Sequence, residues 1–192
     1  MGKKFFFICA LLLVAVTAGG GAIYLISLGR DKKSDQPDQM NTGVSFTRQH
    51  QPNKSTVNLY FANREKIFLT SEDRVLLHPD GTAAFGRIIM EALFKGPQEG
   101  LVPTVPPGTK LRGLFVTDDG IAYVDISESV TAHHPGGAKT ELLTIYSIVN
   151  SLVLNIPEID AVKILIGGRE AATLAGHIDL RFPLKANMLL VR

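Results

Sequence analysis

The chain has 192 residues, of which 45% are hydrophobic and 20% are charged, and its formal net charge at pH 7 is +2. These values are typical of a globular protein, and the length leaves room for one domain with a core of its own. Because the basic residues are scattered and only slightly in excess, the composition gives no case for nucleic-acid binding, and we expect no nucleic-acid partner.

An uncharged, mostly apolar segment covers residues 5–28 and has lysine or arginine on both sides. As a helix it would span roughly 36 Å, which is enough to cross a bilayer core of about 30 Å with some tilt. We therefore predict that residues 1–29 form an uncleaved signal-anchor helix, with cleavage after Ala18 as the alternative. The predicted membrane-spanning residues include Phe5, Leu12, Val16, Ile23 and Leu28.

The short N-terminal tail with Lys3 and Lys4 favours a cytoplasmic N-terminus, so the rest of the chain is expected outside the cytoplasm. The protein would then cross the cytoplasmic (inner) membrane once, with the lipid bilayer as one partner. Residues 30–56 are rich in Asp, Lys, Gln, Asn, Ser and Pro and are predicted to be a flexible polar linker. The single cysteine, Cys9, precedes this linker, so the folded part can form no disulfide.

The predicted folded domain covers residues 57–192 and begins with extended segments. Residues 57–61 and 66–69 have the composition and alternation of two paired strands. Residues 74–77 are predicted to be a further short extended piece.

Apolar residues at helical spacing predict a helix after these strands, capped by Thr82 or Asp80. Gly96 followed by Pro97 predicts its end, with the glycine in the left-handed conformation. Asp119-Gly120, between the alternating segments 110–117 and 121–126, is typical of a tight β-hairpin.

A long helix and a buried strand are predicted over residues 140–168. Pro157 should end the helix, and the β-branched segment 161–166 should form the strand. Further short edge strands are predicted at residues 171–174 and 177–182, with a final strand or a loosely packed segment at 188–191. One apolar stripe should bury the helix on the sheet, and it consists of Leu142, Ile145, Tyr146, Val149, Leu152, Val153 and Ile156.

The order of these elements predicts an α+β fold: two helices packed on one face of a mostly antiparallel sheet, preceded by the N-terminal transmembrane helix. The domain also resembles the GerMN domain family of sporulation, germination and other bacterial envelope proteins. The resemblance extends over residues 57–183. It rests on LYF at residues 59–61, EALFKGP at 91–97, VPPGT at 105–109, DG at 119–120 with VDIS at 124–127, and IVNSL at 148–152 followed by VKILIGG at 162–168.

The resemblance implies a non-enzymatic module outside the cytoplasm, held at the membrane by a signal-anchor or a lipid, that contacts other proteins of the cell envelope. The family implies a role in sporulation or germination. This chain departs from the double-domain arrangement, because only one copy fits, and it lacks the lipidated cysteine of some relatives.

A few residues of the sequence could carry chemistry. The adjacent His133 and His134 are better explained as an exposed polar loop than as a weak divalent metal site, because neighbouring side chains point in different directions. Asp119 and Asp125 could form a carboxylate pair for glycoside hydrolysis. Asp119 is better explained by its position in the turn, and Asp125 lies at a strand end, where a carboxylate often accepts backbone N–H groups. We therefore predict no catalytic residue, no metal site and no cofactor.

The predicted contact surfaces for another envelope protein or for self-association are the proline- and glycine-rich segment 101–108 and the loop 127–139, since loops carry function more often than core elements. A rival hypothesis is a domain that binds, or even hydrolyses, cell-wall polysaccharide, with Tyr123 and the two histidines near a groove. The predicted contact residues are Leu101, Pro106, Pro107, His133 and His134.

Overall fold

The computed structural model of the chain describes residues 53–192. The predicted signal-anchor, with Phe5, Leu12, Val16, Ile23 and Leu28, lies outside the described residues, as does the predicted linker up to residue 52. Within residues 53–192, no helix combines the length and the apolar character needed to cross a membrane.

A two-stranded antiparallel ribbon opens the described part of the chain. β1 (Lys54–Ala62) pairs along its whole length with β2 (Leu69–Leu77). The separate strand predicted at residues 66–69 is wrong except for Leu69, and the piece predicted at 74–77 is the end of the continuous strand β2. Lys66 lies in the intervening turn with φ of 54°, a left-handed conformation that a strand cannot contain.

The first long helix, α2 (Thr82–Phe94), ends as predicted, because Gly96 has φ of 87°. Its N-cap residue is Gly81, and no side chain of the described residues caps it, so the capping role predicted for Thr82 or Asp80 is wrong. Its buried face consists of Phe85, Gly86, Ile89, Met90, Ala92 and Leu93.

A second sheet contains β3 (Leu111–Val116), β4 (Ile121–Ile126), β5 (Ala161–Ile166) and β6 (Arg169–Glu170), in that order. β3 and β4 form the predicted hairpin. β4 and β5 are parallel, because the long helical connection between them returns the chain to the end of the sheet where β4 began. A ribbon and a separate mixed sheet therefore replace the single, mostly antiparallel sheet that was predicted.

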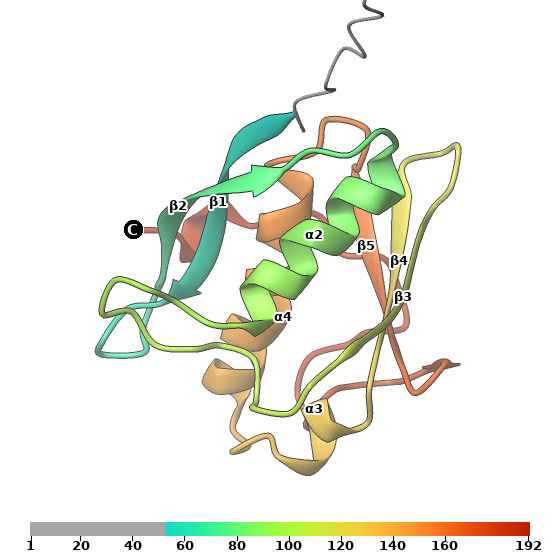
Figure 1. The fold of residues 1–192 in the computed structure, drawn as a ribbon. Coiled ribbons are helices and arrows are strands. Elements are labelled where there is room, and N and C mark those ends of the chain that lie inside the picture. Colours follow the sequence, from blue (N-terminus) through green and yellow to red (C-terminus); the bar gives the residue numbers. More distant parts are fainter. Residues whose placement is uncertain (1–52) are drawn as a thin grey trace, which may run out of the picture. The chain divides into compact units, whose positions relative to one another are not determined.

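Two helices, α3 (Ser129–Ala132) and α4 (Ala138–Val153), form this connection. α2 and α4 contact each other and both sheets, and in Figure 1 they lie between the β1–β2 ribbon and the mixed sheet. The α+β class with helices packed on sheets is therefore confirmed. α4 ends before the predicted stop at Pro157, and the amide side chain of Asn155 pairs with the backbone N–H and C=O of Asn58 at 2.8 Å each.

The C-terminal tail follows the surface with little regular structure. The edge strands predicted at residues 171–174 and 177–182 do not form, and residues 188–190 are the 3-10 helix η1 (Met188–Leu190). Isolated bridges join Leu184 to Val162 and Val191 to Leu69. Buried polar side chains of α4 bind this tail, which is not held by strand pairing over its length.

Candidate functional site

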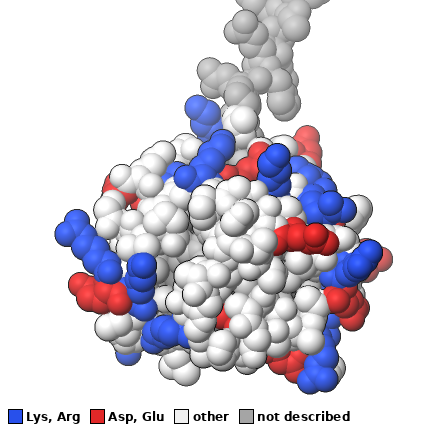
Figure 2. Space-filling model, turned by 90° about the horizontal axis from the view of Figure 1, so that it is seen from below, with Lys and Arg blue, Asp and Glu red and all other residues white. Residues whose placement is uncertain are grey.

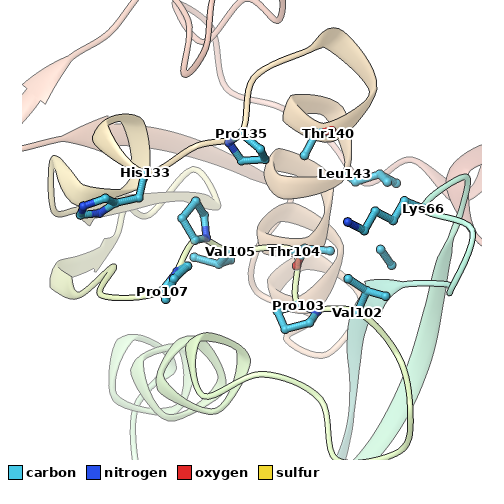
Figure 3. Close-up of a pocket in the computed structure, with 12 residues that line it drawn as sticks. Lys66, Val102, Pro103, Thr104, Val105, Pro107, His133, Pro135, Thr140 and Leu143 are labelled. Atoms are coloured by element: carbon cyan, nitrogen blue, oxygen red, sulfur yellow. The ribbon is translucent and has the colours of Figure 1, made fainter.

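A pocket of about 350 Å³ opens where β1 ends and α4 begins. Its walls come from the β1–β2 turn, residues 102–107, the α3–α4 loop and the first turns of α4 (Figure 3). Most of the lining is apolar and four of the residues are prolines, so we call it the proline pocket. It is lined by Ala62, Lys66, Val102, Pro103, Thr104, Val105, Pro106, Pro107, His133, Pro135, Thr140 and Leu143.

Thr104 holds one wall of the pocket on α4. The Thr144 hydroxyl donates to the Thr104 carbonyl at 2.6 Å, and the Thr104 hydroxyl donates to the Ser147 hydroxyl at 2.7 Å. All three side chains are buried. Because the polar groups of Thr104 are bound to α4, the wall that it supports presents mainly apolar atoms to the pocket.

His134 holds the α3–α4 loop, which forms another wall of the pocket. Its Nδ1 accepts from the backbone N–H of Gly136 at 3.0 Å, so Nε2 carries the proton and donates to the Thr144 hydroxyl at 3.2 Å. Burial lowers the pKa of His134, although the Glu141 carboxylate and a hydrogen bond with the Thr140 backbone oppose this effect. The lowered pKa favours the neutral ring that this arrangement requires, and His134 therefore positions the α3–α4 loop.

Three of the five predicted contact residues line this pocket. Pro106, Pro107 and His133 line it, and they come from the two loops predicted to be contact surfaces. His134 lies behind its wall on α4, and half-buried Leu101 packs against the main core. Among residues 53–192, no group of three or more His, Cys, Asp or Glu side chains is placed to hold a metal ion.

The rim of the proline pocket carries positive charge. The amino group of Lys66 points toward α4 across the pocket from His133 (Figure 3). Two residues further along the chain, the ring of Phe68 lies 5.6 Å from the Lys139 amino group and 5.0 Å from the Arg192 guanidinium. Figure 2 views the molecule from the side on which α3 lies and shows a broad, mostly uncharged surface with charged side chains around its margin.

The polar side of α4 was not predicted to carry contacts. Residues 141, 144, 147 and 151 recur at helical spacing, but a polar stripe on its own predicts a face turned to solvent. In the structure this stripe is fully buried, and each member binds a distant segment. The Ser151 hydroxyl accepts from the backbone N–H of Tyr60 at 3.1 Å, and Asn150 pairs with the backbone of Asn187.

Glu141 organises the tail in the same way. One carboxylate oxygen accepts from the N–H groups of Leu174, Ala175 and Ile178, and the other accepts from the backbone and ring nitrogens of His177. Burial by itself would raise the pKa of Glu141, but these hydrogen bonds outweigh it and lower the pKa.

The pKa of a second buried carboxylate, that of Glu72, is subject to the same two opposing effects. Burial opposes ionisation, and hydrogen bonds from the backbone N–H groups of Gln98 and Glu99 and from Arg74 lower the pKa of Glu72. The two buried carboxylates are thus both ionised at neutral pH and each fixes a loop.

The free energy of unfolding is therefore expected to fall slightly as the pH drops from 7 to 5.5, because the pKa of His134 is lowered in the folded chain, and to fall further below about pH 4.5. The carboxyl groups of Glu72, Glu141 and exposed Asp179, whose pKa is lowered to about 2, have lower pKa values in the folded chain than in the unfolded chain. The unfolded chain then binds more protons in acid, which favours unfolding. Urea midpoints measured from pH 7 to pH 3 test this, and a midpoint that stays level or rises in acid would contradict it.

Comparison of the sequence with known protein families identifies the family of this chain. A family model described as "Germane: Sporulation and spore germination" matches residues 58–172, more than half of the chain. The chain belongs to the Germane family. The GerMN resemblance found in the sequence is thereby confirmed, and no curated protein shows a significant match to this Germane chain.

Solved structures agree with the Germane fold. A protein of Clostridium perfringens assigned as a lipoprotein is 25% identical, with a TM-score of 0.51 over 70% of this chain and 87% of its own. The first GerMN domain of the sporulation protein GerM from Bacillus subtilis is 18% identical, with a TM-score of 0.53 over 68% of this chain and 97% of its own. The tandem GerMN domains of GerM are 18% identical, with a TM-score of 0.54 over 69% of this chain but only 46% of the tandem.

Proposed function

We propose that this Germane-family chain is a membrane-anchored, non-enzymatic interaction module of the bacterial cell envelope, with its folded domain outside the cytoplasm. Its partner is another envelope protein or a second copy, and the proline pocket is the contact site. The apolar segment at residues 5–28 supports the anchor, and the similarity to GerM and to a lipoprotein supports the envelope location.

The position of the proline pocket carries this proposal. The N-terminal segment joins the domain at Lys54, where β1 begins, whereas Ala62 at the other end of β1 lines the pocket. Eight steps along a strand cover about 26 Å. The pocket therefore lies at the end of β1 opposite to the end at which the described part of the chain begins.

The chemistry of the pocket favours contact over catalysis. The polar atoms of Thr104 and His134 are bound to α4 and to the loop backbone, and the surrounding walls are formed mainly by proline, valine and leucine. Such walls are suited to burying an apolar side chain of a partner.

The contact site is tested by filling the pocket in the full-length, membrane-embedded protein. A photo-crosslinking residue placed at exposed Pro107 should give a discrete crosslinked product, and Thr140→Trp should reduce that product at least about fivefold, since a bulky ring would occupy the space a partner needs. Ala84→Trp, on the exposed face of α2, is the matched control and should leave the product unchanged.

Two outcomes would overturn the proposal. One is a product that persists undiminished in Thr140→Trp. The other is full-length protein that sediments with purified cell-wall polymer and gives no protein crosslink, which would favour the polysaccharide-binding hypothesis. The orientation has its own measurement: a reporter enzyme fused after Arg192 should be active only outside the cytoplasm.

A further inference from the structure

The walls of the proline pocket are held in place by proline rings and by hydrogen bonds to α4. Its volume of about 350 Å³ lies at the small end of the range of about 300–1,000 Å³ usual for ligand sites. The rings of Pro103, Pro106, Pro107 and Pro135 stiffen its walls, and the bonds from Thr104 and His134 to α4 fix both loops. Binding then orders few additional side chains, which lowers its entropic cost.

The charge at the rim is placed by the fold. Asn63 fixes the β1–β2 turn, because its side-chain oxygen accepts from the N–H groups of Ile67 and Phe68 at 2.8 and 3.1 Å. The backbone of Lys66 is held in the left-handed region inside this turn. Its amino group therefore extends over the pocket from a fixed base (Figure 3).

Further cations lie near Phe68, two residues along the chain from Lys66: the Lys139 amino group and the Arg192 guanidinium are 5.6 and 5.0 Å from the centre of its ring. Glu65 accepts a hydrogen bond from the Asn63 side chain, and Glu141 points away into the tail loop. No aspartate or glutamate is among the residues that line the pocket.

Resting on the proposed function, we infer that the partner segment is acidic as well as apolar: an extended stretch with an aromatic or aliphatic side chain next to aspartate or glutamate. The apolar side chain fills the pocket, and the neighbouring carboxylate pairs with the Lys66 amino group at its rim. Opposite charge at the rim then selects this partner against neutral or basic segments of similar shape.

The test uses three dye-labelled peptides of one length and the full-length chain in neutral detergent micelles. The first peptide is Gly-Asp-Phe-Leu-Asp-Gly, and the others carry asparagine or lysine in place of both aspartates. Fluorescence anisotropy should show the aspartate peptide binding at least about tenfold more tightly than the asparagine peptide, with an affinity that falls as salt is added. Lys66→Glu should remove this preference and favour the lysine peptide, whereas Lys54→Glu, a charge-matched change at the far end of β1, should leave it intact.

The inference fails if the aspartate and asparagine peptides bind equally within twofold, if neither binds, or if Lys66→Glu leaves the preference unchanged. This failure is distinct from that of the proposed function. A crosslink at Pro107 that Thr140→Trp suppresses would keep the pocket as a contact site even if its partner segment proved to be uncharged.

Discussion

Replacing Glu141 by glutamine is expected to lower the free energy of unfolding by about 3 kcal/mol or more. The fully buried carboxylate accepts hydrogen bonds from the backbone of the 174–178 loop and from His177. An amide of the same shape can accept at only one end, so its NH₂ group would face buried N–H donors and leave them unpaired.

Urea unfolding of Glu141→Gln against the unchanged protein measures this loss. Hydrogen exchange adds a local measurement, because the amides of Leu174, Ala175 and Ile178 should lose protection before those of β5. Glu158→Gln, at an exposed carboxylate, is the matched control and should change the free energy of unfolding by no more than about 0.5 kcal/mol. A loss no larger than that of the control would show that the tail does not depend on Glu141.

Truncating Leu152 to alanine is expected to cost about 2–5 kcal/mol of unfolding free energy. Its side chain is fully buried where α2 crosses α4. A Cβ added at Gly86 of α2 would lie 3.5 Å from Leu152 and 3.2 Å from Leu114, so the helices approach closely at this glycine. Removing Leu152 atoms there leaves a cavity that the surrounding elements cannot fill without moving.

Leu154→Ala, two residues further on, is the matched control. Leu154 is 39% exposed, and its truncation should cost less than about 1 kcal/mol. Chemical denaturation of the two variants side by side measures the difference. Equal losses would mean that the core between α2 and α4 is not packed as described.

Both predictions concern α4, and they separate its two sides. The apolar side, represented by Leu152, was correctly assigned to the core from helical spacing. The polar side, represented by Glu141, was not, because spacing identifies a stripe without saying what covers it. The tail loop at residues 174–178 covers Glu141, and this contact joins residues more than 30 positions apart, which helical spacing cannot reveal.

The pocket was predictable to a limited extent for the same reason. Pro106, Pro107 and His133 were selected because they lie on loops, and loops can be recognised from local composition. Lys66 could not be selected, since its place at the rim depends on the β1–β2 turn and on the start of α4. Whether the selected residues contact a partner stays a prediction that the crosslinking experiment decides.

The sequence by itself determined the family and the elements whose signals are local. The Asp119-Gly120 hairpin, the stop at Gly96 and the two long helices depend on residues within a few positions of each other, and these predictions hold in the structure. Only the tertiary structure decided the separation into a ribbon and a mixed sheet, the parallel pairing of β4 with β5, and the tail without strands. The physical reason is that strand pairing and buried hydrogen bonds join segments that are distant in the sequence. Which segments pair depends on which backbone and side-chain groups the complete fold would otherwise bury without a hydrogen-bond partner.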